Sequence, residues 1–239
     1  MPGEDMALAE ALAADYDGTL AHEGVVDAAT LSALERWRAS GRRLVLVTGR
    51  QLPHLARIFP EHDGFDAVVA ENGAVFAARG KAPMRLAGPP PDELVEALRA
   101  RCGEALAVGS VIVAAPRACE PAVRATLAEL RLPWRVILNK SSLMCLPPGV
   151  DKGAGLFYAL GRLGLEPRRA LGVGDAENDL DFLRLAGVFA VVGNALPELK
   201  AVADVVAPAE AGAGVAWLIE RALSVSRPAV RTATGRSGG

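Results

Sequence analysis

Residues 11–19 read Ala-Leu-Ala-Ala-Asp-Tyr-Asp-Gly-Thr, an apolar run that ends in two carboxylates, a glycine and a hydroxyl. The run has the length of a short buried strand. Gly18 permits a sharp bend directly behind the second carboxylate. With that bend, Asp15 can act as a nucleophile and metal ligand while Asp17 acts as a general acid, two roles that differently placed carboxyls can divide. The stretch is therefore typical of a magnesium-dependent phosphoryl-transfer site.

The same residues also suit two other kinds of structure, a plain turn and a calcium-binding loop. A calcium loop of the EF-hand type needs a glutamate at its twelfth position. Counted from Asp15, the twelfth residue is Val26. An EF-hand is therefore excluded, whereas a plain turn stays open on these residues alone.

Composition limits the classes of protein to which this chain can belong. Its 239 residues, 51% of them hydrophobic, suit a core with a smaller inserted unit. The net charge of −2, with basic residues spread along the chain, predicts no nucleic-acid partner. Three cysteines without metal-ligand spacing and no signal-peptide pattern favour the cytoplasm. The apolar runs are shorter than the roughly 20 residues of a membrane span, so we expect no membrane partner.

Short apolar runs alternate with longer amphipathic segments in both the first and the last third of the chain. The expected elements are strands at 11–14, 43–47, 65–70, 170–173, 188–192 and 204–206, and helices at 27–40, 52–59, 151–163, 177–185 and 214–223. This alternation predicts an α/β fold whose core is a Rossmann-like, doubly wound parallel sheet.

The middle of the chain has a different rhythm, with short strands and two helices after the Gly-Pro-Pro-Pro break at residues 88–91. We predict that residues 81–149 form a small α+β domain. It is inserted into a discontinuous core made of residues 1–80 and 150–225. Residues 226–239 have little to bury and are expected to be a flexible tail.

A second candidate motif, Thr48-Gly49-Arg50, follows the predicted strand 43–47. Open α/β sheets bind ligands at the carboxyl ends of their strands. A hydroxyl and backbone N–H groups at a bend before a helix can hold an anion. The alternative is that the Thr48 hydroxyl only caps the next helix. Arg50 could clamp a phosphate, although an ordinary surface arginine is the favoured interpretation.

Two further motifs lie where the core pattern resumes. Lys152 stands at a helix start, where the helix dipole disfavours a cation, and an anion would explain its presence. Asp175, Asn178 and Asp179 follow the strand at 170–173 and can converge above the sheet edge. Carboxylates with substrate and water oxygens are the ligands that Mg²⁺ prefers. Asp175 is the expected direct ligand, with the other two behind it or on the phosphate.

These four motifs fall in order at one predicted sheet edge, and together they resemble the signature motifs of the haloacid dehalogenase (HAD) superfamily. Glu71-Asn72-Gly73 and the insertion between the second and third motifs resemble the Cof-type (IIB) branch, whose larger α+β cap lies there. The resemblance spans residues 9–223. The acid at position 17 argues against the dehalogenases, which lack it and need no metal.

The resemblance implies a magnesium-dependent phosphatase that acts on a small phosphorylated metabolite. Asp15 would form an aspartyl-phosphate, and Asp17 would serve as acid and then as base. The implied phosphate ligands are Thr48, Gly49, Lys152 and Asn178. The implied metal ligands are Asp15, Asp17 through its main-chain carbonyl, Asp175 and Asp179. A monomer or homodimer is expected.

Substrate choice is expected to lie in the cap, which is compact like those of phosphoglycolate-type and sugar-phosphate phosphatases. Asn139, Lys140 and Ser141 form the favoured selectivity loop, while Arg117 and Arg124 are more typical of a solvated surface. Two alternatives stay open. One is a phosphotransferase or mutase with the same intermediate, and the other is a non-catalytic module that senses phosphometabolites.

Overall fold

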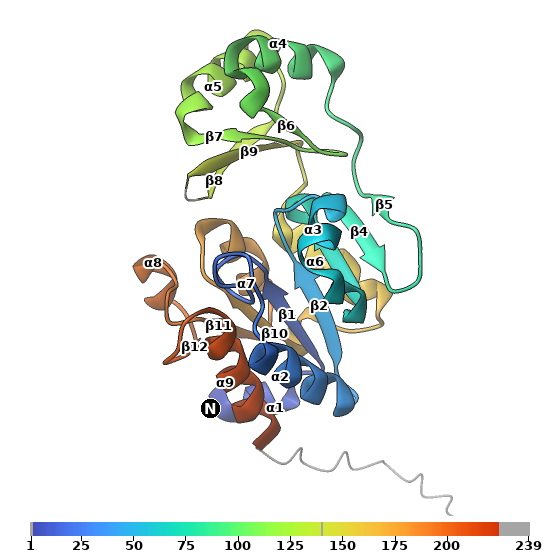
Figure 1. Ribbon diagram of the computed structural model, residues 1–239, viewed down its shortest axis with the longest axis vertical. Coiled ribbons are helices and arrows are strands. Elements are labelled where there is room, and N and C mark those ends of the chain that lie inside the picture. Colours follow the sequence, from blue (N-terminus) through green and yellow to red (C-terminus); the bar gives the residue numbers. More distant parts are fainter. Residues whose placement is uncertain (1, 140, 225–239) are drawn as a thin grey trace, which may run out of the picture.

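The computed structural model describes residues 2–139 and 141–224, and it divides them between two sheets. A large core sheet with helices on both faces occupies the lower part of the molecule in Figure 1. A smaller sheet with its own helices lies above the core in the same view. The predicted doubly wound parallel core with an inserted α+β domain is confirmed.

The core sheet has the strand order β12-β11-β10-β1-β2-β3-β4-β5. Its six strands from β12 to β3 are parallel, and β4 and β5 are antiparallel additions at one edge. The strands are β1 (Ala11–Asp15), β2 (Arg43–Val47), β3 (Ala67–Ala70), β4 (Val75–Ala78), β5 (Met84–Arg85), β10 (Ala170–Gly174), β11 (Val188–Val191) and β12 (Val205–Val206).

Helices cover both faces of this sheet, which is why its central strands are mainly apolar and do not alternate apolar with polar residues. All five residues of β1 and of β10 are buried. The core helices are α1 (Pro2–Leu8), α2 (Ala28–Ala39), α3 (Leu52–Ile58), α6 (Lys152–Arg162), α7 (Leu180–Leu185), α8 (Pro197–Lys200) and α9 (Ala211–Ser224). Side chains of α1, α2 and α9 share one hydrophobic cluster, and those of α6 and α7 belong to another.

The inserted cap is a four-stranded antiparallel sheet in the order β6-β7-β9-β8, covered by two helices. Its elements are α4 (Asp92–Cys102), β6 (Ala107–Val108), β7 (Val113–Pro116), α5 (Glu120–Glu129), β8 (Arg135–Asn139) and β9 (Ser142–Leu146). Both helices lie on the side of this sheet away from the core, so the sheet itself faces the core (Figure 1).

The structure corrects one predicted boundary. Residue 81 was expected to begin the cap, but β5 pairs with β4, through Val75 opposite Arg85, and so belongs to the core sheet. A strand of two residues carries too little periodicity to be assigned from sequence to one sheet or the other. The predicted tail, residues 226–239, and the candidate residue Lys140 lie outside the described part of the chain. Among the described residues, no helix is long and apolar enough to span a bilayer.

Candidate active site

Three neighbouring strands carry the candidate residues to one edge of the core sheet. Asp15 is the last residue of β1, and it pairs with Val47, the last residue of β2, so that Thr48 follows at the same level. Asp175 comes directly after β10, on the other side of β1. Parallel alignment therefore brings together residues that are far apart in the sequence.

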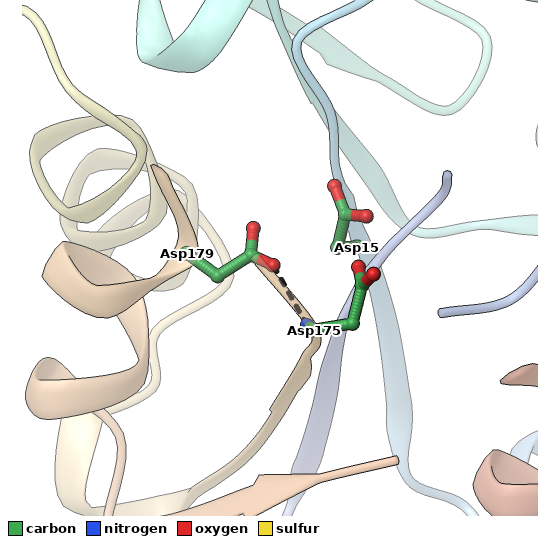
Figure 2. Close-up of side chains that lie close together, drawn as sticks. All are labelled: Asp15, Asp175 and Asp179. Atoms are coloured by element: carbon green, nitrogen blue, oxygen red, sulfur yellow. Dashed lines mark hydrogen bonds between the residues drawn. The ribbon is translucent and has the colours of Figure 1, made fainter. Parts of the chain in front are cut away.

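Three aspartates form a buried cluster at this edge (Figure 2). Asp15, Asp175 and Asp179 each offer a carboxylate oxygen, and these oxygens lie within 4.8 Å of one another. The Asp179 carboxylate accepts hydrogen bonds from the backbone N–H groups of Asp175, at 2.9 Å, and Ala176, at 3.0 Å. The hydroxyl of Thr19 donates to Oδ1 of Asp175 at 3.1 Å.

Lys152 provides the positive charge of the cluster. Its Nζ donates to Oδ1 of Asp15 and to Oδ1 of Asp179, both at 2.5 Å, and the side chain is almost fully buried. Burial lowers the pKa of this ammonium group, but the charges of Asp15 and Asp179 outweigh that effect and raise it above its ordinary value. Lys152 is therefore held in its charged form.

The cluster has an excess of negative charge that suits a divalent cation. With three carboxylates and one ammonium group, the formal charge is −2 when all four are ionised. Burial raises the pKa of Asp15 well above its ordinary value, as do Asp179 and Asp175, whereas Lys152 lowers it. A cation among these oxygens would relieve that repulsion, and an all-oxygen donor set matches the preference of Mg²⁺.

Asp17 lies on the solvent side of this cluster and is held by an arginine. Arg50 donates from Nε to Oδ2 of Asp17 at 2.7 Å and from Nη2 to Oδ1 at 2.6 Å, while its guanidinium lies over the Tyr16 ring. This bidentate pair fixes the plane of the carboxylate. Arg50 is thus not the ordinary surface arginine favoured by the sequence, because its side chain is only 26% exposed and engages a candidate catalytic group.

The chain bends at the Thr48-Gly49-Arg50 segment, directly after β2. The Thr48 hydroxyl accepts from the backbone N–H of Arg50 at 3.1 Å, which is the local capping contact of the alternative interpretation. Gly49 is closely packed, since a Cβ there would lie 3.2 Å from Nδ2 of Asn72 and 3.4 Å from Sδ of Met144. The backbone of this segment is therefore closely packed against Asn72 and Met144.

Asn178 is buried beside the aspartates, in the short 3-10 turn η6 (Glu177–Asp179). Its Nδ2 donates to Oδ1 of Asn72 at 3.0 Å, whereas its own Oδ1 has no hydrogen-bond partner among the described residues. A buried acceptor without a partner is uncommon in folded proteins and suggests a ligand or water at that position.

One residue of this region was missed by the sequence argument. Asn194 donates from Nδ2 to the carbonyl oxygen of Gly18 at 2.8 Å and accepts at Oδ1 from the backbone N–H of Ala211 at 2.7 Å. It thereby ties the loop behind Asp17 to the start of α9. Its position shortly after β11 gave a signal, because polar residues at the carboxyl ends of parallel strands share the ligand-binding edge.

The candidate cap residues are less fully described. Ser141 is exposed in the turn between β8 and β9, and its carbonyl oxygen accepts from the N–H of Arg117 at 2.9 Å. The side chain of Asn139 and all of Lys140 lie outside the described part of the structure. Arg124 forms an exposed ion pair with Glu120 along α5, as expected of a surface residue. Strand β8, which leads into this turn, contacts η6 of the core.

The sequence is similar to a family of hydrolases and to several phosphatases. The model of the haloacid dehalogenase-like hydrolase family matches residues 12–98 and 134–219. A phosphoglycolate phosphatase from Aeropyrum pernix is 30% identical over 230 residues, covering 90% of this chain and 94% of the relative. A phosphoglycolate phosphatase from Haloarcula marismortui is 32% identical over 215 residues, covering 85% and 92%.

Solved structures share the fold. Thermoplasma acidophilum protein 0175 superposes with a TM-score of 0.76 at 20% identity, covering 91% of this chain and 99% of that one. A sugar phosphatase of HAD subclass IIB superposes with a TM-score of 0.70 at 19% identity, covering 90% and 100%. At these identities, the likeness concerns the arrangement of core and cap.

Proposed function

The chain belongs to the haloacid dehalogenase-like hydrolases, in their Cof-type branch, and on this premise we propose that it is a magnesium-dependent phosphatase for a small phosphorylated metabolite. The observation that carries the proposal is the buried cluster in which Asp15 lies beside Lys152, Asp175 and Asp179. Such a cluster combines a nucleophile with the charge compensation that phosphoryl transfer requires.

In the proposed reaction, a carboxylate oxygen of Asp15 attacks phosphorus and the bond to the leaving alkoxide breaks. Asp17 gives the alkoxide its proton, and the product is an alcohol and an aspartyl-phosphate. Asp17 then removes a proton from the water that attacks this intermediate, which releases phosphate and restores Asp15. In the structure Asp17 is ion-paired with Arg50, so it must leave this pair and take up a proton from solvent before it can act as the acid; the pair orients Asp17 before substrate arrives.

The cation would be held by Asp15, Asp175 and the main-chain carbonyl of Asp17, with Asp179 behind them. When bound, Mg²⁺ supplies positive charge to the phosphoryl oxygens and neutralises the acidic cluster. Asp179 itself is oriented by two backbone N–H groups and by Lys152.

The transferring phosphate would be bound by Thr48, the backbone of Gly49, Lys152 and Asn178. Two observations support this role: Oδ1 of Asn178 has no hydrogen-bond partner among the described residues, and the backbone at Gly49 is closely packed against Asn72 and Met144. These are positioning and electrostatic contributions, which dominate phosphoryl transfer.

For the substrate, we propose phosphoglycolate or a sugar phosphate of similar size. The relatives from Aeropyrum pernix and Haloarcula marismortui are named phosphoglycolate phosphatases and match most of this chain. The turn of Asn139, Lys140 and Ser141 would contact the part of the substrate beyond the phosphate.

The test is a phosphate-release screen over phosphoglycolate, sugar phosphates and nucleotides, with Mg²⁺ or with a chelator. Asp15→Asn should abolish release, while Asp63→Asn, which changes a carboxylate that is 90% exposed, should not. Retained turnover in Asp15→Asn would exclude Asp15 as the nucleophile. Consumption of the ester that requires an added sugar acceptor, with the phosphoryl group recovered on that acceptor and not as free phosphate, would favour a phosphotransferase instead.

A further inference from the structure

The turn that follows β3 connects the candidate phosphate loop to the cap. This turn, η2 (Glu71–Gly73), lies beside the Thr48 segment, since the N–H of Glu71 donates to the carbonyl of Arg50 at 3.0 Å and the N–H of Asn72 donates to that of Thr48, also at 3.0 Å. Its backbone is therefore fixed to the phosphate loop, and both of its long side chains reach toward cap residues.

The Glu71 carboxylate binds the loop between β6 and β7 of the cap. Oε1 accepts from the N–H of Ser110 at 2.9 Å, and Oε2 accepts from those of Val111 at 3.0 Å and Ile112 at 3.3 Å. Glu71 is only 1% exposed. Three converging N–H dipoles compensate a buried carboxylate in the way that a backbone nest binds an anion.

Two neighbouring glycines pack closely against this contact, where no side chain would fit. A Cβ on Gly109 would lie 2.5 Å from Oε2 of Glu71, and one on Gly73 would collide with the carbonyl of Asp151 at the start of α6. Glu71 and Asn72 have φ values of 50° and 52°, in the left-handed region that non-glycine residues seldom occupy. Such a conformation persists where surrounding contacts require it.

Asn72 makes a second connection between the cap and the site. Its Nδ2 donates to Sδ of Met144, on β9, at 2.6 Å, and its Oδ1 accepts from Asn178 at 3.0 Å. One turn of the core thus holds the cap at a loop and at a strand, and the same turn contacts two groups of the proposed phosphate site.

We propose that Glu71 is a positioning residue that fixes the cap over the phosphate site and so determines how tightly the enzyme holds the non-phosphate part of its substrate. This inference rests on the proposed phosphatase function. The Glu71 carboxylate accepts from the N–H groups of residues 110–112, so it acts through loop 109–112 and, through the chain, on Asn72. Loss of its carboxylate should loosen the cap while leaving the phosphate loop formed.

The kinetic test compares Glu71→Gln and Glu71→Ala with Glu35→Gln, which changes an exposed glutamate on α2. For phosphoglycolate, or the best ester in the screen, Glu71→Ala should raise KM by about tenfold and lower kcat by less than about threefold. The inhibition constant of inorganic phosphate should change by less than about twofold, because its ligands lie in the core. Glu71→Gln keeps one acceptor oxygen and should be intermediate.

Gly109→Ala tests the same contact from the cap side, because its methyl group would displace the carboxylate. Hydrogen exchange followed by mass spectrometry should show faster exchange of the amides of residues 110–112 in all three variants, including any with no measurable turnover. Unchanged protection there, or equal losses of substrate and phosphate affinity, would overturn the proposal. If the wild-type protein hydrolyses no ester while these amides do respond, the proposed function fails and the cap contact stands.

Discussion

At the residue scale, Lys152 shows how a weak sequence signal acquires a definite role. In sequence it was only a cation at a helix start, which the dipole disfavours. In the structure the buried ammonium lies between two carboxylates, and Asp151 before it caps α6 by accepting from the N–H of Ala154. The start of α6 therefore tolerates the positive charge of Lys152, because Asp15 and Asp179, from two other segments, compensate it.

Replacing Lys152 with Met should destabilise the protein strongly in the absence of divalent cations. Removing one partner of a buried ion pair costs about 3–5 kcal/mol, and urea unfolding measures the loss. The pKa of Lys152 is raised, so its stabilisation is complete below the ordinary lysine value and is lost only as pH rises through the folded value. The difference from wild type should therefore persist across neutral pH. Lys81→Met, at an exposed position, is the control, and equal stabilities of Lys152→Met and wild type would contradict this reasoning.

Arg50 was assigned from sequence to the surface, because nothing local shows where a long basic side chain ends. Its partner Asp17 lies 33 positions earlier and is reached only when β1 and β2 pair. Arg50→Gln should lower kcat by about tenfold, less than the roughly 10²–10⁴ that a general acid contributes, because Asp17 remains but is no longer held. Arg57→Gln, at an exposed position of α3, is the control. If Arg50→Gln keeps the wild-type kcat, the Arg50–Asp17 ion pair has no role in the reaction itself and exists only in the resting enzyme.

At the element scale, α2 shows what a sequence can fix in advance. Asp27 was the expected first residue of a helix, and in the structure it is the N-cap, with its carboxylate accepting from the N–H of Thr30 at 2.6 Å. Asp27→Ala should lower the free energy of unfolding by about 1 kcal/mol, while Asp27→Asn should retain most of the stabilisation that the N-cap provides. Chemical denaturation of the three proteins measures both effects.

The Asp27 N-cap of α2 also makes the stability of the protein depend on pH. The hydrogen bond from the backbone N–H of Thr30 lowers the pKa of Asp27 below its ordinary value. The contribution of Asp27 to stability is therefore present above the pKa that this carboxyl has in the unfolded chain. It is lost as the pH falls through the lower pKa that it has in the folded protein. The difference between wild type and Asp27→Ala should shrink below about pH 4. If the difference in unfolding free energy between wild type and Asp27→Ala stays constant at low pH, the stabilisation does not come from the ionised Asp27 carboxylate.

Elements with strong periodicity or clear ends were predictable, and short ones were not. The helix expected at 151–163 forms α6, and the run at 43–47 forms β2 with the same bounds. By contrast β6, a pair of residues, has no pattern of its own and exists because β7 offers it a partner. Strand β5 lies within a short strand expected at 84–87, but it was assigned to the wrong domain, because its membership of the core sheet depends on pairing with β4.

At the scale of the whole molecule, the aspartate cluster could be predicted from the sequence, but the contacts that join it to the cap and to other loops could not. The order of motifs along parallel strands was enough to predict that Asp15, Lys152 and Asp175 meet at one edge, because parallel topology aligns strand ends. The contacts of Glu71 with the cap and of Asn194 with Gly18, in the loop behind Asp17, depend on how separately folded segments dock. Such contacts have no spacing rule, so only the structure reveals them.

A cation bound in the aspartate cluster should stabilise the whole core. The three aspartates come from the end of β1 and from the segment after β10, so a cation among them would join the two separate parts of the discontinuous core. Binding to the folded state alone stabilises by RT ln(1 + [L]/Kd), about 2.7 kcal/mol at a hundred times Kd. Thermal unfolding should therefore shift upward with Mg²⁺ and return with a chelator. Asp175→Asn should reduce the shift and Asp63→Asn should preserve it, because only the first changes a ligand oxygen of the cluster. A melting temperature that Mg²⁺ leaves unchanged in the wild-type protein would contradict the metal site while leaving the fold assignment intact.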